Sequence, residues 1–412
     1  MRFVLALCLA VPLCAAAQSL GLAEALAIAE SRSPQLAAQR AAAEAAGALV
    51  PAARENPDPK LILGVENVPV EGGERWSLTG DGMTMRRYGV MQEFVRGEKR
   101  ELRETRAAAE ARRESAVVEM QRADLRRDVA VAWLERLYAE RSQQLLAALS
   151  REAELQMQVA NANVGAGKVP VAEAVAARAL RATLADRRQE AEQKARRATA
   201  MLSRWLGNDA ARPLGAAPDI DRLSVHHTSA LEAELEAHPH LAMYTPMEAA
   251  AEADMKLAAA ATKPDWSLEL TYGQRGSAFT DMVTLMFRMD LPIFAGRRQD
   301  PVTLSKMKQL EQVRAQAEDA KQRHVSEIRA GVVDWEVARE RLQRYKSEIV
   351  PLAEERERAA SSAYEGARAD LATALEARRS VIEAKISSLS AELDVARAWA
   401  QLAFLLPERK QP

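Results

Sequence analysis

The sequence predicts a mostly α-helical protein with a small β part, in which long helices pair as antiparallel coiled coils. Three observations predict this fold class. Long stretches lack both glycine and proline, four short stretches alternate apolar and polar residues, and the same layout occurs twice along the chain. Only 18 Gly and 17 Pro interrupt the 412 residues, which also favours long helices over many short elements.

The charge balance argues against some classes of function. Lys and Arg number 57 against 58 Asp and Glu, and the arginines are scattered among glutamates instead of forming a basic patch. We therefore expect no nucleic-acid partner. No serine triad, phosphate-binding loop, catalytic carboxylate pair or dinucleotide fingerprint is found in a suitable context, so we expect neither an enzyme nor a cofactor.

Residues 1–17 are expected to be a secretory signal. Arg2 is followed by an apolar stretch and then by three alanines that end at Ala17, where we expect cleavage. The two cysteines, Cys8 and Cys14, lie inside this segment, so the mature chain would have no disulfide and no thiolate metal site. Leucine precedes both cysteines, which is unsuited to lipidation, so we do not expect a lipid anchor.

The rest of the chain reads as two similar halves. We expect a first repeat at 18–207, a linker at 208–228 and a second repeat at 229–412. Matching features occur in the same order in both halves. They are Ser33-Pro34-Gln35-Leu36 and His238-Pro239-His240-Leu241, Asn56-Pro57-Asp58 and Lys263-Pro264-Asp265, and Trp133 and Trp335.

Each half carries two candidate strands with a period of two, near 60–68 and 84–95 in the first and 265–274 and 281–292 in the second. In 266–272 every second residue is apolar. A pair of soluble hairpins would explain this alternation, and so would a transmembrane barrel. Eight of the 17 aromatic residues beyond the signal cluster around these strands: Trp76, Tyr88, Phe94, Trp266, Tyr272, Phe279, Phe287 and Phe294. This enrichment favours the barrel, and three chains would supply twelve strands.

Long helices are expected at 98–164, 302–365 and 367–406. Residues 98–164 contain no Gly or Pro and would extend about 100 Å as one helix. Apolar residues recur every seven positions from Val118 to Ala160, a coiled-coil pattern. Two breaks, at Gly165-Ala166-Gly167 and at Glu365-Gly366, are therefore expected to be the tips of helical hairpins.

In its whole length the mature chain resembles the outer membrane efflux protein (TolC) family. The resemblance is carried by the duplicated layout and by short motifs in a fixed order. These include the two openings above, Asn56-Pro57-Asp58-Pro59, Leu291-Pro292-Ile293-Phe294 and Tyr364-x-Gly366. The Glu66-Asn67 pair and the run from Gln92 to Arg100 are most similar to the cobalt-zinc-cadmium and copper-silver efflux branch.

This resemblance implies a homotrimeric duct. Four strands per chain would close as a 12-stranded barrel in outer-membrane lipid, and the helices would form a helical barrel in the periplasm. The partners implied are a periplasmic adaptor protein and an inner-membrane pump of the resistance-nodulation-division type. The cargo implied is heavy-metal cations; a multidrug or type I secretion channel is the alternative, and a periplasmic coiled-coil adaptor is the alternative from another class.

Candidate functional residues fall into three groups. By the resemblance, Val164, Gly165, Gly167, Tyr364 and Gly366 at the tips contact the adaptor, although the glycines also suit turn geometry. By strand parity, Glu66, Glu269, Arg288 and Asp290 face the lumen. Asp370 is a candidate either for a carboxylate ring at the periplasmic constriction or for an acid at a helix N-terminus.

Two further groups of residues suggest metal chemistry without specifying a site. The five histidines all lie in the second half, but no clear third ligand accompanies the His238-Pro239-His240 triplet. Six methionines cluster around the strands, where thioethers bind Cu(I) but flexible apolar packing is the commoner role. We therefore assign no metal-binding residues.

Overall fold

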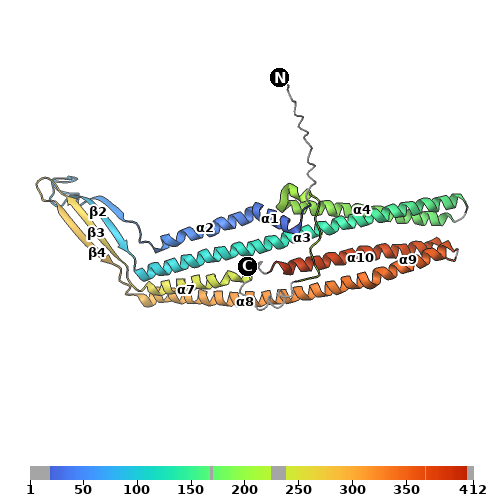
Figure 1. The fold of residues 1–412 in the computed structure, drawn as a ribbon. Helices are drawn as coiled ribbons and strands as arrows, with labels where there is room; N and C mark the ends of the chain where they lie inside the picture. Colours follow the sequence, from blue (N-terminus) through green and yellow to red (C-terminus); the bar gives the residue numbers. More distant parts are fainter. Residues whose placement is uncertain (1–18, 168–169, 224–237, 367, 406–412) are drawn as a thin grey trace, which may run out of the picture. The chain divides into compact units, whose positions relative to one another are not determined.

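The computed structural model describes residues 19–167, 170–223, 238–366 and 368–405 (Figure 1). The expected signal, residues 224–228 of the expected linker and residues 229–237 lie outside these ranges. The chain divides into two units, one formed by residues 1–36, 121–238 and 324–412, and the other by 37–120 and 239–323. We call them the helical unit and the sheet unit. Three helices contribute residues to both units: α2 (Pro34–Arg54), whose first three residues belong to the helical unit, α3 (Gly97–Gly165) and α8 (Ala295–Arg344).

The sheet unit contains one antiparallel sheet of four strands in the order β1-β2-β3-β4. The strands are β1 (Lys60–Glu66), β2 (Met85–Phe94), β3 (Trp266–Gln274) and β4 (Met282–Met289). All four predicted strands are present, although β4 ends three residues earlier than expected, shortly before Pro292, which has no N–H for a strand ladder. The expectation of a mostly helical chain with a small β part is confirmed.

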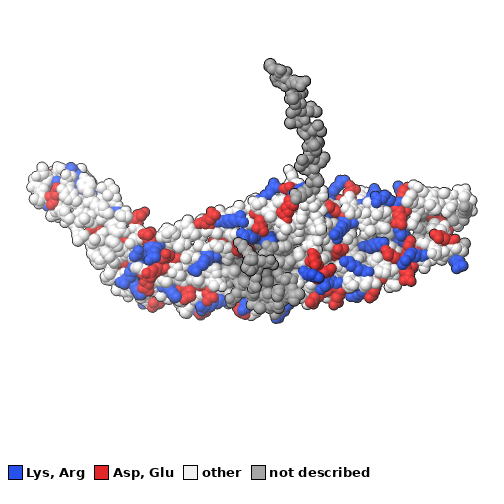
Figure 2. Space-filling model, viewed as in Figure 1, with Lys and Arg blue, Asp and Glu red and all other residues white. Residues whose placement is uncertain are grey.

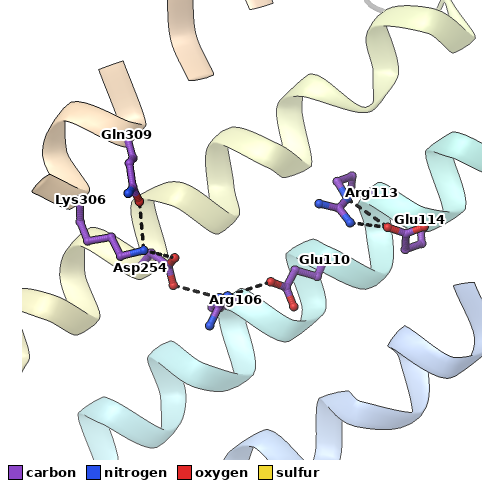
Figure 3. A network of polar contacts seen from close by, with 7 residues as sticks. All are labelled: Arg106, Glu110, Arg113, Glu114, Asp254, Lys306 and Gln309. Atoms are coloured by element: carbon purple, nitrogen blue, oxygen red, sulfur yellow. Dashed lines mark hydrogen bonds and ion pairs between the residues drawn. The ribbon is translucent and has the colours of Figure 1, made fainter. Parts of the chain in front are cut away.

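Polar contacts join the helices of the sheet unit, which are α2 (Pro34–Arg54), α6 (Pro239–Ala242), α7 (Tyr244–Ala260) and parts of α3 and α8. Asp254 of α7 lies 2.9 Å from Arg106 Nε of α3 and 3.1 Å from Lys306 Nζ of α8 (Figure 3). Gln39 of α2 donates to Glu114 of α3 at 2.7 Å. These helices are thus held by specific pairs as well as by small-residue packing.

The junction between strands and helices is fixed by two short side chains that precede strands. Asp265, just before β3, accepts hydrogen bonds from the Arg96 backbone N–H at 3.0 Å and from Lys99 Nζ at 2.8 Å. Asn56, shortly before β1, accepts from the Val95 backbone N–H at 3.1 Å. The two residues that lead into α3, Val95 and Arg96, are therefore anchored to both incoming segments.

The helical unit packs α1 (Leu22–Arg32), α4 (Val171–Leu206), the 3₁₀ turn η1 (Gly207–Ala211), α9 (Val350–Glu365) and α10 (Leu371–Ala403) with the remaining parts of α3 and α8. Within this unit Ala132, Leu146, Ala153 and Ala160 of the predicted seven-residue seam are buried. Leu146 packs with Leu184 of α4 and Ile382 of α10. The seam therefore does form a helix-packing surface.

Two tryptophans make corresponding contacts in the core of the helical unit. Trp133 Nε1 donates to the Leu20 carbonyl at 3.2 Å, and Trp335 Nε1 donates to the Ile220 carbonyl at 3.1 Å. Donor and acceptor are 113 residues apart in the first pair and 115 in the second. In each half, an indole on the long helix holds the segment that leads into that half.

The helix predicted at 302–365 differs from the observed one in two ways. It begins earlier, at Ala295, and it is interrupted by a π-turn at Tyr345–Ile349. The physical reason for the π-turn is Pro351, whose ring would clash with the carbonyl four residues earlier in a regular helix. The Val350 N–H accordingly reaches back five residues to the Tyr345 carbonyl. Likewise, the last helix, expected at 367–406, begins at Leu371 and ends at Ala403.

Candidate channel surfaces

The sheet exposes its apolar face, the reverse of the arrangement in a soluble protein. Two rows of side chains cross all four strands in register on this face, and each member is between 44% and 72% exposed. The rows are Leu61, Val90, Leu270 and Leu285, and Leu63, Tyr88, Tyr272 and Val283. The face of the strands visible in Figure 2 is mostly uncharged, whereas acidic and basic side chains are mixed over the helices. The sheet thus presents a continuous apolar surface.

Aromatic rings lie on the same face at the end of the sheet from which β2 leads into α3. Phe94 and Trp266 stack with ring centroids 4.1 Å apart, and Trp266 and Phe287 are 5.8 Å apart. Aromatic side chains at the border of an apolar band are typical of membrane interfaces, where the ring meets both hydrocarbon and water.

The polar face of the sheet brings together three of the four residues that parity assigned to a lumen. Glu269 of β3 is only 3% exposed and binds Arg288 of β4 at 2.7 Å. Arg87 of β2 binds both Glu269 and Glu66 of β1. The fourth residue, Asp290, lies just beyond the end of β4 and is exposed.

Arg87 is the residue of this network that the sequence prediction missed. It has the opposite parity to Tyr88 and Val90, so the alternation in 84–95 places it on the polar face. Gly89, two residues further along β2, lies on the same face. A Cβ at Gly89 would lie only 2.2 Å from Thr271 Cγ2 and 2.7 Å from the Leu270 carbonyl, so only glycine fits there. The polar face is therefore closely packed, with Glu269 and Thr271 covered.

The two hairpin tips lie in the helical unit. In the first, α3 ends at Gly165, and Gly167 has a φ of 67°, a left-handed conformation that favours glycine. In the second, Gly366 donates to the Ser362 carbonyl at 3.0 Å and ends α9. Tyr364 of the second tip is hydrogen-bonded to the Glu173 carboxylate of α4, which follows the first tip. Burial and this carboxylate raise the pKa of the Tyr364 hydroxyl. Val164 accepts from the Gly167 N–H at 2.9 Å.

Asp370 is the N-cap of α10. Its carboxylate accepts from the Thr373 hydroxyl at 2.6 Å and from the Thr373 backbone N–H at 2.9 Å, and these bonds hold the pKa of Asp370 below its ordinary value. The capping role is therefore present in the structure.

Two histidines meet in the helical unit. His238 Nδ1 and His324 Nε2 are 2.8 Å apart and both side chains are buried. Among the described residues, no three His, Cys, Asp or Glu side chains group in a way that would hold a metal ion. His226 and His227 lie outside the described residues.

No helix in the described part of the chain is both long and apolar enough to cross a membrane.

Comparison with known proteins identifies the fold. No family model and no curated protein sequence matches the chain. Among solved structures, it is similar to a membrane protein from Pseudomonas aeruginosa, with a TM-score of 0.80 and 18% identity over 93% of this chain and 89% of that chain. It is also similar to the outer-membrane channel OprN, with a TM-score of 0.77, 18% identity and the same coverages.

A third similar structure is CusC, a protein studied for transmembrane channel formation. The TM-score is 0.76 and the identity 14%, over 94% of this chain and 92% of that chain. Because OprN and CusC match almost equally well, the fold does not single out one branch of such channels. Identities at this level show a shared fold: the chain has the fold of outer-membrane channel proteins.

Proposed function

We propose that this chain is the outer-membrane channel of a tripartite efflux system, a passive duct through the outer membrane and periplasm. The observation that carries the proposal is the sheet whose apolar face is exposed while Glu269 and Thr271 on its polar face are covered. An apolar band of this kind is stable against hydrocarbon and unfavourable in water. The fold shared with outer-membrane channels supports the same function.

The proposal includes a homotrimer. Within the described sheet, the outer edges of β1 and β4 have no neighbouring strand. In hydrocarbon every backbone N–H and C=O needs a partner, so an open sheet must be closed by further strands. Three copies give twelve strands, an even number that suits an antiparallel barrel. Glu66, Glu269, Arg288 and Asp290 would then face the water-filled lumen.

The periplasmic partners proposed are an adaptor protein at the hairpin tips and, beyond it, an inner-membrane pump of the resistance-nodulation-division type. Leu155 and Val159 of α3 and Val171 and Val175 of α4 lie near the first tip with more than half of each side chain exposed, which supports contact with a protein there. Val164, Gly165, Gly167, Tyr364 and Gly366 are the proposed contact residues. Asp370 stays the candidate for the periplasmic constriction, with its capping role beside it.

The cargo proposed is heavy-metal cations, and the support is the similarity of the sequence motifs to the metal-efflux branch. A multidrug or type I secretion channel is the alternative within this fold. A periplasmic adaptor is the alternative from another class, and the exposed apolar rows argue against it because such a protein has no use for a lipid-facing sheet.

Growth of a deletion strain tests the function and the cargo together. Sensitivity to zinc, cobalt, cadmium, copper or silver salts, relieved by the complementing gene, is the expected result. Sensitivity to drugs and detergents alone would retain the channel and reject the metal cargo. A protein that extracts from cells in buffer without detergent and runs as a monomer would contradict the channel itself.

A further inference from the structure

A series of ion pairs crosses the polar face of the sheet from one edge to the other. Glu66 on β1 binds Arg87 on β2, Arg87 binds Glu269 on β3, and Glu269 binds Arg288 on β4 at 2.7 Å. We call these four residues the charge ladder. Each strand contributes one member, and acid and base alternate across the sheet.

The inner and outer members of the charge ladder differ in exposure. The side chains of Arg87 and Glu269 are 17% and 3% exposed, and each has two ionic partners. The side chains of Glu66 and Arg288, on the edge strands, are 43% and 51% exposed, and each has one ionic partner among the described residues. Arg288 also contacts the Met91 sulfur at 3.5 Å. The ladder therefore starts with an accessible acid and ends with an accessible base.

The strand directions allow the ladder to continue into another copy. Each neighbouring pair of strands is antiparallel, so β1 and β4 run in opposite directions. When β4 of one copy is placed beside β1 of the next, the antiparallel pattern continues. Arg288 is in register with Ser267 near one end of the sheet, whereas Glu66 is in register with Met85 near the other end. The strands of a barrel tilt and their register is staggered, and such a stagger between copies is what would let Arg288 be followed by Glu66. The polar faces stay on the same side of the extended sheet.

The contact between β4 and β1 is the one that a ring of copies requires. The two edges of the sheet are different strands, so joining β4 of one copy to β1 of the next is a heterologous contact. Heterologous contacts are the kind that close rings.

We propose that Arg288 of one copy pairs with Glu66 of the next, so that the charge ladder runs continuously around the closed barrel. This inference rests on the proposed function, because it presumes an oligomeric barrel. It adds the pair of side chains that would join one copy to the next.

Cysteine cross-linking in whole cells tests the contact directly. The only cysteines in the chain are Cys8 and Cys14, inside the expected signal, so introduced cysteines would stand alone. Glu66 and Arg288 lie on opposite edge strands of one sheet, so Glu66→Cys with Arg288→Cys in one chain should be joined only between copies. Treatment with a short bis-maleimide is expected to give covalent dimers and covalently closed trimers on denaturing gels.

Matched controls separate this inference from the proposed function. Glu66→Cys with Glu93→Cys keeps both cysteines on the polar face, but Glu93 is on the inner strand β2, so no oligomer should be joined. If amine cross-linking of the unaltered protein gives trimers but the Glu66→Cys, Arg288→Cys variant gives no cross-linked product, the inference is overturned and the proposed channel is retained. Joining of the Glu66→Cys single variant to itself would also overturn it. Monomers throughout would reject the proposed function.

A double-mutant cycle tests the charges themselves in variants that replace each charged group by a neutral amide. Glu66→Gln and Arg288→Gln are each expected to lower the temperature at which the oligomer dissociates in detergent. The two changes together should lower it by less than the sum, because both remove the same pair. Strictly additive shifts would overturn the pairing even if the strands meet.

Discussion

Among the glycines of the four strands, Gly89 has the least free space for a side chain. It lies on the polar face of β2, opposite Thr271 of β3, and a Cβ there would overlap Thr271 and the Leu270 carbonyl. Gly64 of β1 lies on the same face, but a Cβ there would have no atom within 4 Å. The two glycines therefore differ in their roles. Gly89 permits the close approach of β2 and β3, whereas a larger side chain would fit at Gly64.

Replacement of Gly89 is expected to weaken the sheet. Gly89→Val should destabilise the folded protein by about 1–3 kcal/mol, the usual cost of overpacking. Gly64→Val is the matched control and should have little effect. The measurement is the fraction of protein that stays folded in outer membranes as temperature rises, and equal behaviour of the two variants would contradict the close packing at Gly89.

Asp265 is expected to make stability depend on pH. Burial disfavours its ionised form, but hydrogen bonds from Lys99 and the Arg96 N–H outweigh this effect and lower the pKa of the carboxyl. A lowered pKa gives stability that is present above the unfolded-state pKa and is lost as the pH falls through the folded-state pKa.

Asp265→Asn should therefore destabilise the protein at neutral pH by about 1.5–3 kcal/mol, the range for hydrogen bonds to charged groups. It should also remove this part of the acid dependence. Asp58→Asn, the exposed aspartate at the corresponding place in the first half, is the control. Thermal unfolding in detergent at acidic and neutral pH measures both, and a pH dependence unchanged from the unaltered protein would contradict the assignment.

At the scale of elements, each strand acts as a two-sided unit whose exposed side is apolar. Exposed apolar residues alternate with covered or partly covered polar ones from Trp266 to Tyr272 of β3. Long helices have the opposite pattern, because their small apolar seams are buried and most of their charged residues are outside, with Lys99 and Arg136 of α3 as buried exceptions. One chain therefore contains elements suited to two different solvents.

A charge on the exposed side of β3 distinguishes lipid from water. Leu270→Arg should be nearly neutral if that side faces water, but should cost about 2–4 kcal/mol if it faces the centre of a bilayer. Reduced assembly into outer membranes is the expected result. Leu49→Arg, at an exposed leucine of α2, is the control and should assemble normally. Normal assembly of Leu270→Arg would contradict a lipid-facing sheet.

At the scale of the whole molecule, the polar face of the sheet is nearly neutral. It carries Lys60, Arg87 and Arg288 against Glu66, Glu93 and Glu269. A lumen lined by paired charges of both signs has little reason to prefer cations or anions. Selection of cargo in the proposed system would then fall to its partners, as suits a passive duct.

Ion selectivity measures this balance. The purified channel in a planar bilayer with a salt gradient is expected to show a reversal potential near zero. Glu269→Gln leaves Arg87 and Arg288 with one carboxylate fewer, so it should shift the channel toward anions. Glu71→Gln, in the segment between β1 and β2, serves as the control for a carboxylate away from the strands. An unchanged reversal potential in Glu269→Gln would contradict a lumenal position for Glu269.

Much of the local structure follows from residues close together in the sequence. Alternation predicts the four strands and the face of Glu269, because side chains of a strand point to opposite sides at successive positions. Absence of Gly and Pro predicts the long helix from 98 to 164, and the break at Gly165 predicts its end. Pro351 was sufficient reason to expect an interrupted helix, and that signal was missed.

Tertiary structure alone decided which distant residues meet. The sequence determined that Glu66, Glu269 and Arg288 share a polar side of their strands, since parity is local. It did not determine that Arg87 joins two of them, because Arg87 and Glu269 are 182 residues apart and their contact depends on the register between β2 and β3. The same holds for His238 and His324. Periodicity fixes the direction of a side chain, but partners are fixed by the packing of whole elements.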